Sequence, residues 1–225
     1  MADVSASPGS THSVRTGTWE DLPRLRRLLA AAYSADALMA WIFREPTHRA
    51  DAVAAWLGLF LEPALQQGAV DVVHDDDGHV IAACAWRPPD PAPKTPAPQN
   101  PAPRDAGAPT VAGLLAALVG SEHAARVGAG LALLRPHAPQ APSAYVQFLA
   151  VDPGHQRRGL GSVALQPGLD RAAAAQIGVH LETTNPDAVP FYEARGFAVT
   201  AELDLPAGPH VWVLAMTDLE EGHRE

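Results

Sequence analysis

The segment "SAYVQFLAVDPGHQRRGLGS", residues 143–162, constrains the fold of this chain more than any other. Its first nine residues, "SAYVQFLAV", predict a β-strand with one face formed by Tyr145, Gln147, Leu149 and Val151. An Asp-Pro-Gly turn ends this strand, and a helix interrupted at "QPG" is expected over residues 158–177. A strand, a tight turn and a helix in succession indicate an α/β sheet that is partly parallel.

Two glycines, Gly159 and Gly161, stand where this helix begins. Without Cβ atoms they let a ligand approach the backbone, and the first N–H groups of a helix have no partner within it. The helix dipole adds partial positive charge, so such a terminus binds phosphate. Arg157 and Arg158 add formal charge. The alternative is a helix start that tolerates glycine at a cost of about 1 kcal/mol per residue.

The remaining segments alternate between the helical and the strand period. A strand and helix in "SVRTGTWEDLPRLRRLLAAAY" precede two helices, a hairpin around Asp75–Gly78, further helices, and finally strands alternating with helices. This order predicts a mixed, partly parallel twisted sheet of about six to seven strands flanked by helices. We expect one domain over residues 13–217, carrying a Pro-rich insertion at 87–109, between a disordered N-terminus, 1–12, and a polar tail, 218–225.

Composition excludes several classes of protein. The chain has 225 residues and a net charge of −9, which argues against nucleic acid as a partner. Its single cysteine, Cys84, forms no internal disulfide and is expected in the core. The histidines show no metal-binding spacing, so no metal is expected. With no apolar run long enough to span a bilayer and no secretory signal, we expect a cytoplasmic monomer or homodimer that binds no membrane.

The hexapeptide Gln156-Arg157-Arg158-Gly159-Leu160-Gly161 resembles the pyrophosphate-binding motif of the GNAT superfamily of acetyltransferases, Q/R-x-x-G-x-G/A. The lead-in "VDPGHQ" and the later "LETTNPDAVPFYEARGF" are also similar to that family. A narrower resemblance, to puromycin N-acetyltransferases and their relatives, rests on the Pro-Gly step at Pro167 and Gly168 and on the "PFYE" helix. The Pro-rich segment departs from that pattern, and "YSADALMAWIFREPTH" matches it only loosely.

The resemblance implies a GNAT fold and acetyl-CoA as acyl donor. It places the pyrophosphate on the backbone amides of Arg157 through Gly161, with Gln156 and Ser162 nearby. The pantetheine arm would lie as a pseudo-strand beside Leu149, Ala150 and Val151, while the strand over 179–184 splays away to admit it. An N–H of the first strand would stabilise the oxyanion. Asn185 would reach the pantetheine, and Tyr192 would protonate the leaving thiolate.

The acceptor side is less constrained. Glu182 ends the strand expected to line the cleft and is the first candidate for the general base, with a water chain as the alternative. Tyr145 and Gln147 would orient the acceptor amine, and Trp41 and Phe43 lie in the segment expected to roof it. Each residue also has a purely structural interpretation: Tyr192 and Trp41 as core aromatics, Asn185 as a turn residue, Glu182 as a surface carboxylate.

Three hypotheses follow. The first is an acetyl-CoA-dependent N-acetyltransferase that acts on the primary amine of a small molecule, with an antibiotic aminonucleoside as a candidate acceptor. The second keeps the donor but acetylates a protein or peptide amine. The third is a non-catalytic module that binds acyl-CoA. A closed pocket roofed by residues 36–48 would favour the first hypothesis, and an open, shallow groove the second.

Overall fold

The computed structural model describes residues 12–89 and 110–216. Within them a single sheet has the strand order β1-β2-β3-β4-β5-β7-β6. Its strands are β1 Ser13–Thr16, β2 Val70–His74, β3 Val80–Arg87, β4 Ser143–Val151, β5 Gly178–Thr183, β6 Ala198–Asp204 and β7 His210–Met216. Neighbouring strands are antiparallel except β4 and β5, which are parallel. The mixed, partly parallel sheet predicted from the sequence is confirmed.

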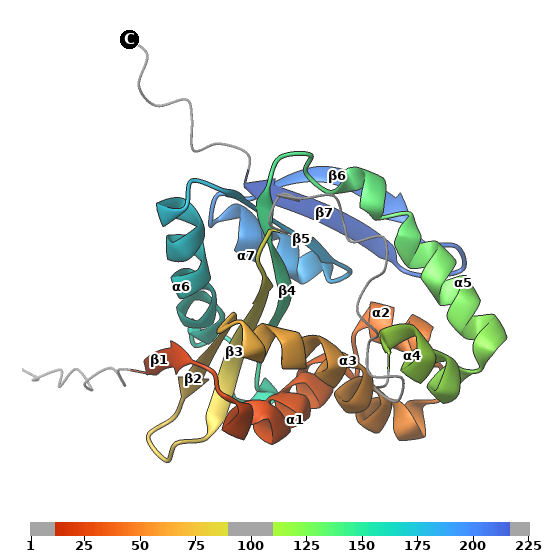
Figure 1. Cartoon of the computed structure of the whole chain (residues 1–225), viewed down its shortest axis with the longest axis horizontal. Helices are drawn as coiled ribbons and strands as arrows, with labels where there is room; N and C mark the ends of the chain where they lie inside the picture. The colour runs from red at the N-terminus through yellow and green to blue at the C-terminus, as the bar shows by residue number, and fades with distance from the viewer. Residues whose placement is uncertain (1–11, 90–109, 217–225) are drawn as a thin grey trace, which may run out of the picture.

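Helices cover both faces of this sheet (Figure 1). They are α1 Leu22–Tyr33, α2 Ala37–Ile42, α3 Arg49–Gln66, α4 Val111–Val119, α5 Ser121–Ala132, α6 Leu160–Ala174 and α7 Val189–Glu193. In Figure 1, α6 (teal) lies on one side of β2, β3 and β4, and α1 and α3 (orange) lie on the other. The expected order of helices and strands is confirmed along the described chain.

The helical spacing of Leu22, Leu25, Leu28, Leu29 and Ala32 predicts an apolar face on the first helix, and this face of α1 forms part of the core. Leu25, Leu28 and Leu29 are buried, and α1 packs against α3, β3 and β4. Cys84 is fully buried in β3, as expected for a small core residue, and burial raises the pKa of its thiol well above the ordinary value. The core therefore reaches the centre of the sheet, beneath the strand that carries the candidate site.

The sequence predicted an interruption of helix α6 at the Gln-Pro-Gly step. In the structure α6 is instead continuous through Pro167. Proline lacks only one donor of the helical ladder, and its usual effect is a local kink. The following residue, Gly168, is buried against the Trp86 indole of β3, and a Cβ there would overlap the ring. The glycine therefore allows α6 to approach the sheet closely.

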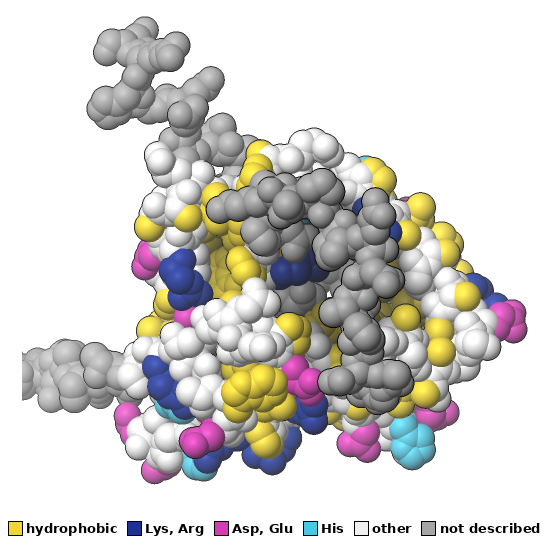
Figure 2. All heavy atoms as spheres, in the orientation of Figure 1, with side chains coloured by type: hydrophobic (Ala, Val, Ile, Leu, Met, Phe, Trp, Pro, Cys, Tyr) yellow, Lys and Arg dark blue, Asp and Glu magenta, His cyan; other side chains and the backbone are white. Residues whose placement is uncertain are grey.

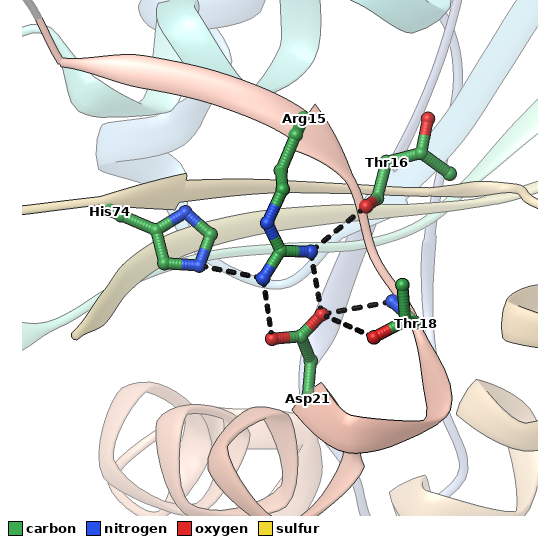
Figure 3. Close-up of polar contacts among 5 residues, drawn as sticks. All are labelled: Arg15, Thr16, Thr18, Asp21 and His74. Carbon is green, nitrogen blue, oxygen red and sulfur yellow. Dashed lines mark hydrogen bonds and ion pairs between the residues drawn. The ribbon is translucent and has the colours of Figure 1, made fainter. Parts of the chain in front are cut away.

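An ion pair fixes the first strand to the first helix (Figure 3). Two nitrogens of Arg15 on β1 donate to the two carboxylate oxygens of Asp21, each at 2.8 Å. Asp21 also accepts from the backbone N–H and the hydroxyl of Thr18, and His74 on β2 approaches Arg15 at 3.0 Å. The Arg15 guanidinium holds the pKa of the buried Asp21 carboxyl at about 2. This cluster attaches β1 to the body of the molecule.

The expectations for residues 1–11, most of the Pro-rich insertion (90–109) and the tail fall outside the described residues. No helix of the described ranges is both long and apolar enough to cross a membrane. On the face shown in Figure 2, basic and acidic side chains are interspersed, with hydrophobic side chains between them. That face therefore carries charges of both signs.

Candidate active site

The central strands separate after a short parallel pairing. β4 and β5 are paired only from Ser143 with Gly178 to Tyr145 with His180. From Val146 to Val151, β4 has no β5 partner in the described part of the chain, although β3 still pairs with its other edge. The splay expected beside this strand is present, and it leaves backbone N–H and C=O groups of β4 facing a gap.

A bulge in β4 lies at the start of the gap. Ala85 of β3 pairs with Phe148 and Trp86 pairs with Val146, so two steps along β4 oppose one step along β3, with Gln147 as the extra residue. Such a bulge bends the strand and redirects its side chains. Burial nevertheless alternates along the whole of β4, as expected from the sequence, and Tyr145, Gln147 and Leu149 of the expected face line one cavity together with their neighbours Val146 and Phe148. Val151, the fourth residue of that face, does not line it.

This cavity has a volume of about 410 Å³ and lies between the splayed strands and the helices α1 to α3. Aromatic side chains form much of its wall: Tyr33, Trp56, Phe60, Tyr145, Phe148 and Tyr192. Its charged lining residues are Asp36, Arg87, Arg135 and Glu182, together with His180. The cavity thus combines flat apolar surfaces with carboxylates able to receive a cation and arginines able to receive an anion.

The glycine-rich turn stands beyond the end of β4. Within the described residues, none of the N–H groups from Arg157 to Gly161 donates to a protein acceptor; the first N–H groups with one are those of Ser162 and Val163, which donate to the Gly159 carbonyl. Arg157 and Gly159 have positive φ angles of 63° and 79°. Runs of backbone N–H groups in such conformations form anion-binding concavities. The predicted phosphate cradle therefore has free backbone donors.

The side chains around this turn are placed differently from one another. Arg157 and Arg158 are exposed, whereas the Leu160 side chain is buried in the core, so Leu160 can offer a ligand only its backbone. Gln156 reaches back to the Val151 carbonyl at 3.4 Å. Neither arginine contacts a described acidic group here, which leaves both able to receive an anion.

Arg195, which the sequence reasoning did not single out, also reaches this turn. Its guanidinium lies 3.6 Å from the centroid of the Phe191 ring and donates to the Ser162 hydroxyl and to the Phe191 carbonyl. Phe191 in turn touches Gly161, where a Cβ would meet the ring at 3.3 Å. Because Arg195 is 33 residues from Ser162, nothing in the local sequence pattern marks this contact.

Tyr192 lines the cavity and is 8% exposed. Its hydroxyl makes no hydrogen bond with another residue in the described ranges, although its ring packs edge-on against Phe191 and Phe197. Burial raises its pKa well above the usual tyrosine value, with smaller effects of Tyr33 and Cys84 in the same direction. The phenol is therefore protonated at neutral pH.

Glu182 lines the same cavity from β5. Burial raises the pKa of its carboxyl above the ordinary range, while Tyr145 and Arg87 offset part of the shift. The Arg87 guanidinium lies over the Tyr145 ring, 4.5 Å from its centroid. The Tyr145 ring also packs against the His180 ring, with centroids 5.0 Å apart. Burial lowers the pKa of His180, which keeps the imidazole neutral. Glu182 is therefore poised closer to neutral pH than an exposed carboxylate.

Trp41 and Phe43 do not line this cavity, in contrast to the expectation from the sequence. The Trp41 indole fits between Gly130 of α5 and Gly208 in the β6–β7 turn. Phe43 is buried and packs edge-on against Trp56, with ring centroids 5.8 Å apart. Both rings stabilise the contacts of α2 with its neighbours. Phe43 is buried and Trp41 is half-buried in contacts away from this cavity, so neither ring forms its wall.

The segment expected to roof the cavity contributes other residues instead, Asp36, Leu38 and Met39. The Asp36 carboxylate caps α2, accepting from the N–H groups of Leu38 and Met39, and it also accepts from the Thr184 hydroxyl at 3.0 Å. This last contact links the α1–α2 turn to the end of β5. No local pattern in the sequence predicts this link, because it joins residues 148 positions apart.

Asn185 occupies a turn. Its side-chain oxygen accepts from the Asp187 N–H at 3.0 Å, and the residue is exposed and absent from the lining of the cavity. Asp187 contributes its backbone N–H to this turn, and the N-cap of α7 is Ala188. Away from this site, the side chains of Asp75, Asp77 and His79 lie close enough together on the β2–β3 turn to hold a metal ion. The Asp75 carboxylate, however, already accepts the backbone N–H groups of Asp77 and His79.

Comparisons with known proteins agree with this fold. The sequence profile of the Acetyltransferase (GNAT) family matches residues 22–197. Similar solved structures include an HPA2-related histone acetyltransferase from Corynebacterium glutamicum (TM-score 0.61, 19% identity, covering 91% of this chain and 95% of that one). Others are the Drosophila melanogaster polyamine N-acetyltransferase that forms N-acetylagmatine (0.59, 18%, 91% and 98%) and arylalkylamine N-acetyltransferase 2 from Aedes aegypti (0.62, 9%, 91% and 98%).

Proposed function

Because the chain belongs to the GNAT acetyltransferase family, we propose that it transfers the acetyl group of acetyl-CoA directly to the primary amine of a small molecule. One observation carries this proposal: the unpaired edge of β4 runs from a cradle of free backbone N–H groups to a cavity that contains Glu182 and Tyr192. A phosphate-bearing donor and an amine could thereby meet at the same point.

In this proposal the chain binds the donor mainly with its backbone. The N–H groups of residues 157–161 hold the pyrophosphate, with Arg157, Arg158 and Ser162 around it, and the α6 dipole favours its charge. The open edge of β4, from Leu149 to Val151, pairs with the pantetheine arm as a further strand would. Asn185 remains a candidate for contact with the arm from the β5 side, although its side chain now caps a turn.

The chemical step uses two side chains and one backbone group. Glu182 accepts a proton from the ammonium, directly or through water, and the free amine nitrogen then attacks the thioester carbonyl carbon. A β4 N–H stabilises the oxyanion of the tetrahedral intermediate. When the carbon–sulfur bond breaks, Tyr192 donates its proton to the thiolate. The nitrogen then loses its second proton, which returns through water to the Tyr192 oxygen, so the proton on Glu182 is the one released to solvent. The products are the amide and free CoA, and no acyl-enzyme forms.

The lining of the cavity favours an acceptor that is both cationic and flat. Asp36 and Glu182 suit an ammonium group, and Trp56, Phe60 and Phe148 offer aromatic surfaces. The neighbours that acetylate polyamines and arylalkylamines act on small amines of this kind. The sequence resemblance to puromycin N-acetyltransferases adds aminonucleoside antibiotics to the candidates, with resistance or self-protection as the role.

The test has two parts. Calorimetry should detect binding of acetyl-CoA, and a thiol assay should then detect one CoA released per amine acetylated, over a panel of agmatine, spermidine, tyramine, puromycin, an aminoglycoside and short peptides. If acetyl-CoA does not bind, the proposal fails. Binding without turnover of any amine would leave a non-catalytic acyl-CoA module, and turnover of peptides alone would favour the second hypothesis. Resistance is tested by expression in a puromycin-sensitive host.

A further inference from the structure

The hydroxyl of Tyr33 occupies the open edge of β4. Tyr33 is the last residue of α1, and its Oη donates to the Leu149 carbonyl at 2.9 Å while accepting from the Leu149 N–H at 3.2 Å. Its ring packs edge-on against Phe148, with centroids 6.2 Å apart. One side chain therefore satisfies both backbone groups of one strand residue, across 116 positions of sequence.

These two groups are the ones that a neighbouring strand would use. In a strand, the N–H and C=O of a given residue point to the same side. Leu149 is aligned with Cys84 of β3 on one side, and on the other side β5 has already separated from β4. The Tyr33 hydroxyl, with one donor and one acceptor, takes the place that a peptide-like amide pair would take there.

We propose that Tyr33 is a gate on the donor site, whose hydroxyl closes the open edge of β4 in the free protein and must release Leu149 before the amide-bearing arm of an acyl-CoA can pair with it. This inference rests on the proposed function. The inference extends that function: the donor must displace the hydrogen bonds between Tyr33 and Leu149 when it binds, and this lowers its affinity.

The surroundings of Tyr33 allow this exchange. Tyr33 lines the cavity, so its ring has open space beside it and its hydroxyl can hydrogen-bond to water there after release. The residues that follow form a turn, with Ser34 hydrogen-bonded to Ala30 and Asp36 to Tyr33, and α2 begins only at Ala37. Burial raises the pKa of the phenol, so the hydroxyl remains neutral and keeps both its donor and its acceptor.

The experiment compares the wild type with Tyr33→Phe, which removes the hydroxyl but keeps the ring and its contact with Phe148. Two ligands are titrated into each protein: acetyl-CoA, and adenosine 3′,5′-bisphosphate, which has phosphates but no arm. We expect Tyr33→Phe to bind acetyl-CoA about three- to tenfold more tightly, the equivalent of one or two net hydrogen bonds. Binding of the bisphosphate should be unchanged.

Equal affinity of the two proteins for acetyl-CoA, or weaker binding by Tyr33→Phe, would overturn the gate and leave Tyr33 as a packing or donor-contacting residue. A change of the same size for the bisphosphate would also overturn it, because that ligand does not reach Leu149. If neither protein binds acetyl-CoA, the proposed function falls as well, so the two failures are distinguishable.

Hydrogen exchange at the Leu149 amide gives a second readout. In the free wild type this amide should exchange slowly, because Tyr33 accepts its hydrogen bond, and in free Tyr33→Phe it should exchange at least tenfold faster. Saturating acetyl-CoA should slow exchange in both proteins to similar rates. An unchanged exchange rate in free Tyr33→Phe would contradict the role of the hydroxyl even if the protein were slightly destabilised.

Discussion

Gly168 of α6 lies against the indole of Trp86 in β3, so closely that a Cβ on the glycine would overlap the ring. Trp86 is 4% exposed and its indole nitrogen has no hydrogen-bond partner among the described residues. The contact therefore depends on shape alone. It is also the contact that brings α6, with the phosphate cradle at its N-terminus, onto the central strands of the sheet.

We predict that Gly168→Ala destabilises the protein by about 1–3 kcal/mol, the usual cost of adding volume to a packed core. The measurement is urea denaturation followed by circular dichroism. Gly128→Ala is the matched control, because that glycine is in the interior of α5 with nothing within 4 Å of an added Cβ. It should stabilise the protein by about 0.5–1 kcal/mol. Equal effects of the two substitutions would contradict the close contact.

The phosphate cradle is tested by a pair of glycines with the same backbone conformation. Gly159 and Gly78 have φ angles of 79° and 78°, and neither has an atom within 4 Å of an added Cβ. Alanine at either position should cost about 1 kcal/mol of backbone strain. Only Gly159→Ala should weaken acetyl-CoA binding, by about tenfold or more in calorimetry, because Gly78 is on the distant β2–β3 turn. Similar affinities would place the phosphates elsewhere.

Tyr192→Phe should lower kcat by about 10²-fold or more, the usual contribution of a general acid or base. The dissociation constant for acetyl-CoA should change less than threefold, since the hydroxyl bonds to no described residue and the ring remains. Steady-state kinetics with a reactive amine and calorimetry with the donor measure the two effects separately. An unchanged kcat would assign Tyr192 to the core and leave the thiolate to be protonated by water.

Glu182 should determine the acid limb of the pH profile of kcat/KM. Its carboxyl is active when deprotonated, and burial raises its pKa, so activity should fall with decreasing pH at a value above about 4.3, that of an exposed glutamate. Glu182→Gln should lower kcat/KM and abolish this limb. His180 lines the same cavity, so His180→Gln identifies the titrating group: if it alone removes the limb, Glu182 is not the base.

The Arg15–Asp21 pair predicts a specific loss of stability in acid. The folded-state pKa of Asp21 is about 2, below the unfolded value of about 3.9, so its stabilisation is present above pH 4 and lost as the pH falls towards 2. Arg15 is half-exposed, which reduces the expected contribution to about 1–2 kcal/mol. Asp21→Asn should destabilise by that amount at pH 7, and the difference from wild type should shrink as the pH falls through about 2.

Asp77→Asn, at an exposed position of the β2–β3 turn, provides the control for this measurement. It should have little effect at either pH. A difference between wild type and Asp21→Asn that is independent of pH would show that the side chain acts through its shape and its hydrogen bonds to Thr18 rather than through its charge.

Much of the fold follows from local patterns in the sequence. The alternation in residues 143–151 and the helical spacing of Leu25, Leu28 and Leu29 are periodicities that burial imposes directly, and the structure confirms the elements they predict. The continuity of α6 was not predictable in the same way. Whether a proline ends a helix depends on what the helix packs against, and here that partner, Trp86, is some 80 positions away in sequence.

The site was predictable to the extent that its parts are contiguous. Gln156 to Ser162 form one turn, and their role can be inferred from neighbours in the chain. Tyr33 and Asp36 contact residues more than a hundred positions away, so only the fold brings them to the site. Trp41 was misplaced for the opposite reason: a tryptophan in a short helix suits a pocket wall or a core equally well, and two distant glycines decide between them.

The gap between β4 and β5 has a definite length. Six residues, Val146 to Val151, lie beyond the last paired position, and at about 3.3 Å per residue they span about 20 Å. An exposed edge strand at the side of a sheet can recruit any chain of any length. This interior edge is bounded by the paired strands at one end and by the glycine turn at the other, so an extended segment that pairs with it can be no longer than about 20 Å.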